Sequence, residues 1–427
     1  MDLALSTGAY RAALDALFAR TTGQWKLGLE RVEGFLRELG DPHRRIPTLH
    51  IAGTNGKGSV CASLETVLRR QGFRVGTYTS PHLVDFRERF RIDGVPIDEA
   101  PILAFLERWT PRVEALGVTF FEATTAMGFQ LFAEANVDIA VIETGLGGRL
   151  DATNVVHPLV AGVTSIGFDH MEWLGETLPL IAREKAGIFK AGVPAIVGEP
   201  DPGVRRVLAE EGARGGAAPG RIVAEEGEAT AVRGTAAGTR FRWQGLEVAT
   251  GLAGQHQVAN ALVALTMLDA LPAPFHVPRE AAVAALAEVR LAGRFSRQGR
   301  WIFDVAHNPA GAAVTAETLR AVAPAGPVVA LVSILGDKDW RGILRALAPM
   351  VQGFLLTNAP TAPESRAWVA SEALAYAHSE GWPAELVPDF ERALARAPAL
   401  GETILVTGSF HTVGDAMARL PGSLATG

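Results

Sequence analysis

Seven residues in the first quarter of the chain have the types and spacing that bind phosphate. They are Gly53-Thr54-Asn55-Gly56-Lys57-Gly58-Ser59, between an apolar run at 48–52 and a helix-like run at 60–68. In a strand–glycine loop–helix segment, backbone N–H groups and the helix N-terminus face the anion. Lys57 would add a mobile cation for the outer phosphates, and Ser59 a hydroxyl for a metal. Gly58 separates the two, a departure from the usual G-x-x-x-x-G-K-[ST] spacing, so a glycine-rich turn without a ligand is the alternative.

Other polar residues lie just beyond, or soon after, strand-like runs of the same region. They are Ser80, Glu143, His170 and Lys185. The carboxyl ends of parallel strands meet at one edge of a sheet, where ligands of open α/β sheets bind. An acid at such a strand tip, beside a phosphate loop, is well placed to hold Mg²⁺ directly or through water. The alternatives are a solvated charged face and a structural histidine.

Four further segments contain groups suited to binding. The amides of 254–261 suit the hydrogen-bonding edge of a nucleobase. The aromatic and glycine-bearing segment 25–31 either lines a pocket or connects two helices. From Trp301 onward strand and helix patterns alternate again, and polar groups follow the strand ends at 304–309 and 408–411.

Composition and charge narrow the class of protein. The chain has 427 residues, 48% of them hydrophobic and 20% charged, as in soluble globular enzymes. No apolar run approaches the roughly 18 residues that span a membrane. The net charge of -6 argues against a protein that coats nucleic acid. The single cysteine, Cys61, excludes an internal disulfide and fits a reducing compartment, so we expect a cytoplasmic protein. We expect Cys61 to serve packing and the protein to be a monomer.

The pattern of elements predicts an α/β protein of two domains. A chain of this length exceeds one ordinary core, and the alternation of strand and helix predicts mostly parallel sheets. We place the first domain at 1–292 and the smaller second domain at 293–427. The Gly- and Ala-rich segment 212–250, with its short strand-like pieces, is predicted to form an antiparallel flap appended to the first domain.

Taken together, these residues resemble the Mur ligase superfamily of ATP-dependent amide ligases, and within it the bacterial dihydrofolate synthase/folylpolyglutamate synthase family. The resemblance spans nearly the whole chain. Its motifs are GTNGKGS at 53–59, SPHL at 80–83, ETGLGGRLDATN at 143–154, REKAGIFK at 183–190, HQVANA at 256–261, GRF at 293–295, DVAHNP at 304–309 and DKD at 337–339. The resemblance implies a P-loop ATPase-type domain followed by a Rossmann-like α/β domain.

The resemblance also implies a mechanism and residue roles. ATP phosphorylates the terminal carboxylate of dihydropteroate or a folate, and the α-amine of L-glutamate attacks the acyl phosphate. Lys57, His170 and a carbamylated Lys185 would act in catalysis. ATP would contact Gly56, Lys57, Gly58, Ser59, Asn260, Arg294 and Asp304. Mg²⁺ would be held by Ser80, Glu143 and His170. The pterin substrate would lie near Leu27, Gly28, Leu29, Phe121 and Asp151, and glutamate near His307 and Ser409.

Two other functions remain open from the sequence. One is a monofunctional folylpolyglutamate synthase or another amino-acid ligase of the superfamily. The other is a P-loop nucleotide switch, which would leave the polar strand ends of the second domain without a role. Cell-wall ligases of the superfamily carry an additional N-terminal domain, and the 52 residues before Gly53 are too few for it, which favours a folate substrate.

Overall fold

The computed structural model describes residues 8–20, 28–225, 227–324 and 326–420. The chain forms two compact units. Unit 1 comprises 1–82, 86–226 and 262–282, and unit 2 comprises 83–85, 227–261 and 283–427. The α/β class predicted from the sequence is confirmed in both units. Within the described ranges, no helix is both long and apolar enough to cross a membrane.

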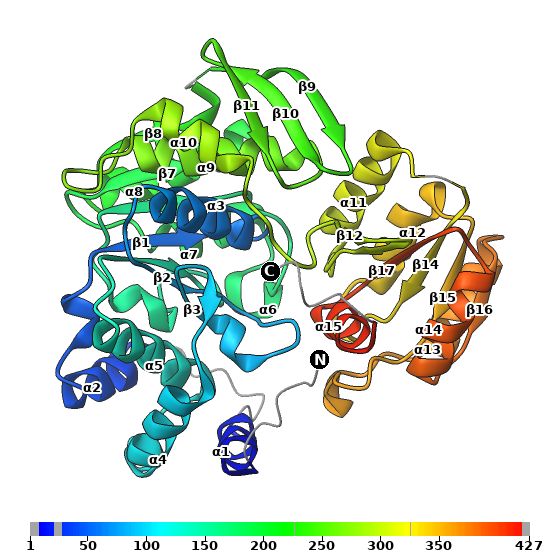
Figure 1. The fold of residues 1–427 in the computed structure, drawn as a ribbon, viewed down its shortest axis with the longest axis horizontal. Helices are drawn as coiled ribbons and strands as arrows, with labels where there is room; N and C mark the ends of the chain where they lie inside the picture. The colour runs from blue at the N-terminus through cyan, green and yellow to red at the C-terminus, as the bar shows by residue number, and fades with distance from the viewer. Residues whose placement is uncertain (1–7, 21–27, 226, 325, 421–427) are drawn as a thin grey trace. The chain divides into compact units, whose positions relative to one another are not determined.

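Unit 1 is built on one eight-stranded sheet in the order β4-β3-β2-β5-β1-β6-β7-β8 (Figure 1). All pairs from β2 to β8 are parallel, and only β3 and β4 are antiparallel. The strands are β1 (Thr48–Ala52), β2 (Val75–Tyr78), β3 (Phe90–Ile92), β4 (Val95–Pro96), β5 (Ile139–Glu143), β6 (Val160–Val163), β7 (Pro194–Val197) and β8 (Ala218–Ile222). The sequence did not signal the β3–β4 hairpin.

Helices cover both faces of this sheet. They are α1 (Gly8–Phe18), α2 (Glu30–Glu38), α3 (Lys57–Arg70), α4 (Glu99–Ala115), α5 (Phe120–Glu134), α6 (Met171–Leu174), α7 (Leu178–Ala186) and α8 (Pro202–Arg214), with 3-10 turns η1 (Pro42–Arg44), η2 (Phe86–Arg89), η3 (Ala152–Val155) and η4 (Val223–Glu225). The core of α2, α4 and α5 meets one face at β2 and β5, and α7 and α8 continue that layer over β6 and β7. Helix α3 packs on β1, β2 and β5. Because helices bury the central strands on both faces, the sequences of these strands are continuous apolar runs.

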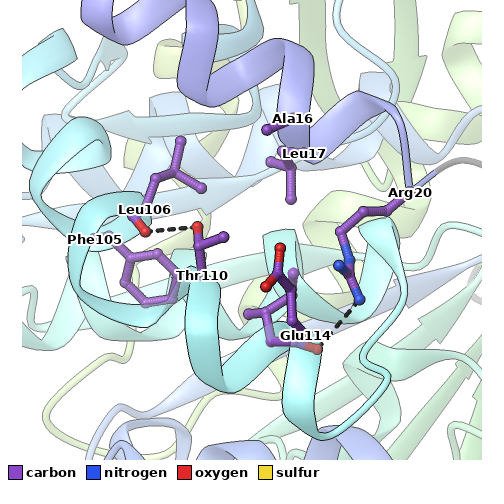
Figure 2. Close-up of a pocket in the computed structure, with 9 residues that line it drawn as sticks. Ala16, Leu17, Arg20, Phe105, Leu106, Thr110 and Glu114 are labelled. Carbon is purple, nitrogen blue, oxygen red and sulfur yellow. Dashed lines mark hydrogen bonds between the residues drawn. The ribbon is translucent and has the colours of Figure 1, made fainter.

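A cavity of about 20 Å³ lies between α1 and α4 (Figure 2). Arg20 closes it by donating to the backbone oxygens of Val113 (3.2 Å) and Val118 (3.1 Å). On the opposite wall, the Thr110 hydroxyl donates to the Leu106 oxygen at 2.6 Å. This volume admits about one water molecule, so the cavity is a packing feature and not a substrate site.

Unit 2 contains a six-stranded sheet in the order β12-β13-β17-β14-β15-β16 and a separate three-stranded sheet, β11-β10-β9, drawn in green in Figure 1. The strands are β9 (Thr230–Thr235), β10 (Gly238–Trp243), β11 (Leu246–Thr250), β12 (Ser296–Gln298), β13 (Trp301–Phe303), β14 (Val328–Val332), β15 (Gly353–Leu356), β16 (Ala384–Leu386) and β17 (Thr403–Thr407). Only β12 is antiparallel in the larger sheet.

The helices of unit 2 also form two layers. They are α11 (Pro309–Val322), α12 (Trp340–Leu347), α13 (Ala370–Ser379), α14 (Phe390–Arg396) and α15 (Phe410–Arg419), with 3-10 turns η5 (Ala348–Met350), η6 (Glu364–Arg366) and η7 (Ala397–Ala399). The first three pack on one face of the larger sheet, and α14 and α15 pack on the other. Helices α9 (His256–Asp269) and α10 (Arg279–Leu286) each contribute residues to both units.

The antiparallel flap predicted within 212–250 exists as β9–β11, but contacts group residues 227–261 with unit 2 and not with the first domain. The physical reason is that β9 packs against α11. Helix α13 begins at Ala370, and residues 364–366 form a separate 3-10 turn after Pro363. The predicted boundary at 292/293 stays a prediction.

Candidate active site

Four loops of unit 1 meet because their strands are neighbours. The order β2-β5-β1-β6 places side by side the segments that follow these strands, all at the carboxyl edge of the sheet. Ser80 follows β2, Glu143 ends β5, the glycine loop follows β1, and Asp169 and His170 follow β6. The sheet order therefore brings the residues predicted to handle phosphate and metal to one edge, as parallel topology requires.

The glycine loop is tied to the loop after β6 by backbone and hydroxyl bonds. Thr54 N donates to Ser165 O at 2.7 Å, and the Thr164 hydroxyl donates to Asn55 O at 2.7 Å. Gly53 has φ +148°, and a Cβ there would lie 1.8 Å from the Thr164 hydroxyl oxygen, so only glycine fits. Gly56 has φ +93° and directly precedes α3. The result is a fixed loop that ends at the N-terminus of a 14-residue helix, with Lys57, Gly58 and Ser59 in its first turn.

Lys57 and Lys185 point their amines at the same backbone oxygen. Lys57 Nζ donates to Gly53 O at 3.1 Å and to Thr54 O at 3.3 Å, and Lys185 Nζ donates to Gly53 O at 2.9 Å. Lys185 is only 5% exposed. Burial and the charge of Lys57 lower the pKa of Lys185 to about 7, although Asp169 and Asp151 oppose the shift. Near neutral pH the Lys185 amine is therefore far more readily deprotonated, and so more nucleophilic, than an ordinary lysine amine.

The predicted metal ligands lie on adjacent strand ends. Glu143 is 5% exposed, and its Oε2 accepts from Ser80 N at 3.2 Å. His170 is partly exposed, has φ +51°, and donates its backbone N–H to Asp169 Oδ1 at 3.0 Å. No three His, Cys, Asp or Glu side chains among the described residues cluster closely enough to hold a metal by themselves. A carboxylate, a hydroxyl and an imidazole fit a divalent cation whose other ligands are water and phosphate oxygens.

Asp151 is engaged within the protein. It is 4% exposed and accepts four hydrogen bonds: from Gly145 N (2.9 Å) and Leu146 N (2.7 Å) on Oδ2, and from the backbone N–H and hydroxyl of Thr153 on Oδ1. Burial raises the pKa of Asp151, and these donors oppose the rise. His50 continues the chain through Thr153, with Nε2 2.8 Å from its hydroxyl. Asp151 thus organises the loop 145–151, and its predicted contact with the pterin stays a prediction.

The other residues predicted near the pterin lie around the start of α5. Leu27 is outside the described residues. Gly28 has φ +121°, and Leu29 directly precedes α2. The half-buried Phe121 ring packs against Gly145, where a Cβ would lie 2.4 Å from the ring. Arg31 and Glu122, paired at 3.0 Å, join α2 to α5, a link that the sequence did not signal.

In unit 2, four of the predicted ATP and glutamate residues, Arg294, Asp304, His307 and Ser409, lie near the ends of β13 and β17, while Asn260 lies in α9. The Asp304 carboxylate accepts from Phe295 N, Ala306 N and the Thr315 hydroxyl at 2.9–3.0 Å. Burial raises the pKa of Asp304, and Arg294 opposes the rise. Phe410 lies between two of the predicted residues: the Arg294 guanidinium is 5.3 Å from its ring centroid, and the His307 ring is 5.7 Å away.

Ser409 and Asn260 make internal contacts. The Ser409 hydroxyl accepts from Thr412 N at 3.1 Å and thereby caps α15. Asn260 donates to Gln257 Oε1 at 2.9 Å, and Gln257 in turn contacts His256 at 3.0 Å. The mostly buried His256 has its pKa lowered to about 4 by burial and by Arg294. The sequence predicted a polar segment here but not this buried chain of amides and imidazole.

Two known protein families match this chain. "Mur ligase middle domain" matches residues 51–268, and "Mur ligase, glutamate ligase domain" matches residues 290–410. A dihydrofolate synthase/folylpolyglutamate synthase of Bacillus subtilis is 33% identical over 96% of this chain and 99% of the relative.

Solved structures match this chain over nearly their whole length, at a similar sequence identity. "E.coli FolC in complex with DHPP and ADP" has a TM-score of 0.84 and 34% identity, and the match covers 96% of this chain and 97% of that one. A bifunctional folylpolyglutamate synthase/dihydrofolate synthase with Mn, AMPPNP and L-glutamate bound has a TM-score of 0.81 and 35% identity, and the match covers 96% and 98%.

The two family matches, which cover one α/β unit after the other, place the chain in the Mur ligase class of ATP-dependent ligases. The chain belongs to the dihydrofolate synthase/folylpolyglutamate synthase family of that class.

Proposed function

We propose that this protein is an ATP-dependent ligase that joins L-glutamate to dihydropteroate and to folates through an acyl phosphate, releasing ADP and phosphate. The observation that carries the proposal is the convergence of Lys57 and Lys185 on the Gly53 oxygen, next to the strand that ends in Glu143. Relatives with DHPP and ADP, or with Mn, AMPPNP and L-glutamate, support the same set of substrates.

The chain's own residues account for the first step. The N–H groups of Gly56, Lys57, Gly58 and Ser59 at the start of α3 hold the ATP phosphates, and the Lys57 ammonium offsets charge on the transferring group. A divalent cation, Mg²⁺ in our proposal, is held by Ser80, Glu143 and His170 and neutralises phosphate charge when bound.

Lys185 contributes through its unusual amine. Its neutral form adds to carbon dioxide and releases a proton to solvent, so that a carbamate anion stands beside Lys57 in place of an amine that is otherwise partly protonated. This relieves the repulsion between two ammonium groups at one carbonyl and supplies oxygens that suit a hard cation.

The remaining assignments concern the other substrates and the whole protein. Phe121 and Asp151, with the segment at 27–29, bind the pterin. Asn260, Arg294 and Asp304 contact ATP, and His307 and Ser409 bind glutamate. The first domain is 1–292 and the second 293–427, and the protein is a cytoplasmic monomer that binds neither nucleic acid nor membrane.

The test is turnover with ATP, L-glutamate and a panel of pterin acids. We expect ADP, and inorganic phosphate that carries one oxygen from an ¹⁸O-labelled pterin carboxylate. Release of AMP and pyrophosphate would contradict the acyl-phosphate route. Activity confined to folates that already carry glutamate would favour the monofunctional synthase over the bifunctional one.

A further inference from the structure

Arg89, in the charged segment after β2, is a buried cation without a paired carboxylate. It is 6% exposed, and its Nε donates to His82 Nδ1 at 2.9 Å. Among the described residues, no acidic oxygen lies within 4 Å of its guanidinium. Glu88 and Glu143 act on it only from farther away, and the Tyr78 hydroxyl is its other polar neighbour.

Burial of the Arg89 charge destabilises the folded protein unless an anion binds to the guanidinium. Arg91, two residues along the chain, shows the usual solution, because it pairs with Glu65 at 3.0 Å. A buried charge that lacks such a partner strongly destabilises the folded protein. A guanidinium carries five N–H donors in a planar fork that matches a carboxylate. The observed contacts of Arg89 leave donors of that fork for a ligand.

Aromatic rings surround the Arg89 guanidinium. Its Cζ is 5.4 Å from the centroid of Phe120 and 5.8 Å from that of Phe86. The half-buried Phe18 ring stacks on Phe120 at 5.2 Å, and the His82 ring meets Phe86 at 5.9 Å. These rings would accept an aromatic body while the cation accepts its acidic end.

The reacting groups lie close to this cluster along the chain. Ser80 N donates to Glu143 at 3.2 Å, and Ser80 is two residues before His82, the hydrogen-bond partner of Arg89. A substrate carboxylate approaching Glu143 would be repelled by it, and a neighbouring guanidinium offsets that repulsion.

We propose that Arg89 recognises the carboxylate of the acid substrate and holds it for phosphorylation. The proposal rests on the proposed function and adds a specificity-determining residue to it. Dihydropteroate ends in an aryl carboxylate, so an anion contact set among aromatic rings suits its chemistry.

The test is calorimetric binding of pteroic acid and its neutral carboxamide to the full-length protein. We expect the wild type to bind the acid at least ~10-fold more tightly, the lower range for a charge-assisted contact. Arg89→Met should reduce this preference to below about 3-fold and leave amide affinity nearly unchanged, because the aliphatic chain retains the packing. In turnover, KM for the acid should rise while KM for ATP stays constant.

Arg91→Met is the matched control, since it removes a mostly buried arginine of the same segment that already has a carboxylate partner. It should lower stability and keep the preference for the acid. If Arg89→Met does not fold, Arg89→Lys keeps the charge but loses the fork, and should reduce the preference about 3-fold or more.

A preference for the acid that survives in the folded Arg89 variant would overturn the proposal, as would equal losses for acid and amide, which indicate a structural role. A protein that makes no glutamyl product but loses its acid preference with Arg89 would refute the proposed function and leave this contact intact.

Discussion

At the residue scale, the notable feature is one carbonyl oxygen, that of Gly53, which accepts from two lysine amines. Two ammonium groups this close repel one another, and burial penalises the charge of Lys185 further. The protein thereby keeps an amine of lowered pKa beside the glycine loop. Lys57, predicted to contact phosphate, and Glu143, predicted to bind the metal, can be tested separately.

Replacing Lys57 or Glu143 by alanine should lower kcat by at least ~10²-fold, because each stabilises charge that develops during phosphoryl transfer. The measurement is steady-state ADP release, with urea unfolding to show that stability is nearly unchanged. Lys57→Arg, which keeps the positive charge, should retain more activity than Lys57→Ala. Near-wild-type rates in either alanine variant would place the phosphate site elsewhere.

Lys185→Ala should be nearly inactive and should regain part of its rate with acetate or formate, because a small carboxylate can replace the carbamate oxygens. In the wild type, ¹³CO₂ should give a carbamate signal by NMR that is absent in the variant. The carbamate has no catalytic role if Lys185→Ala keeps wild-type turnover in buffer depleted of carbon dioxide.

At the element scale, the start of α5 positions the predicted pterin site. The Thr119 hydroxyl accepts from Glu122 N at 3.3 Å, and Glu122 Oε2 accepts from Thr119 N at 2.8 Å, which forms a capping box. Arg31 then binds the same carboxylate from α2. One acid therefore both begins α5 and fixes α2, the helix that Leu29 precedes.

Glu122→Ala should lower the free energy of unfolding by about 2 kcal/mol or more, since it removes both the cap of α5 and the ion pair between Arg31 and the buried Glu122 carboxylate. It should also raise KM for the pterin acid. The control is Glu38→Ala, which breaks an exposed pair with Arg112 and should change stability little. Equal urea midpoints for the two variants would show that the capping box is unimportant.

At the scale of the whole molecule, each unit contains a buried neutral imidazole. Burial lowers the pKa of His50 in β1 to about 3, with a smaller contribution from Lys190, and that of His256 to about 4. In the unfolded chain both would take up protons near their ordinary pKa of about 6.5. Because the unfolded state binds more protons below that pH, acid favours unfolding of both units.

The contribution of these two imidazoles to stability should therefore be full above pH 6.5 and fall progressively as the pH drops toward 3 to 4. Between pH 7 and pH 5, His50 alone should account for about 2 kcal/mol of the loss. Urea unfolding at several pH values measures it. His50→Gln should flatten the profile, and exposed His157→Gln should not. Identical slopes for His50→Gln and wild type would refute this assignment.

The sequence by itself determined the class of fold, and it predicted that the glycine loop at 53–59 binds phosphate. Buried parallel strands read as continuous apolar runs, and the glycines of 53–58 mark a turn that few other residues can make. These signals are local, because they depend on a residue and its near neighbours. Eight motifs, in the same order as in the family that the chain resembles, predicted the roles of residues far apart in the chain.

Tertiary structure alone decided how those residues are used. Only the strand order β2-β5-β1-β6 brings Ser80, Glu143 and the glycine loop together. Only burial distinguishes Arg89 from a solvated charge, and Asp151 from a free carboxylate. The apolar neighbours of Lys185 predict a buried amine, but its contact with Gly53 O and the charge of Lys57 beside it come from segments remote in sequence. The same is true of the burial of the Arg89 guanidinium without a carboxylate partner, which no local pattern could have revealed.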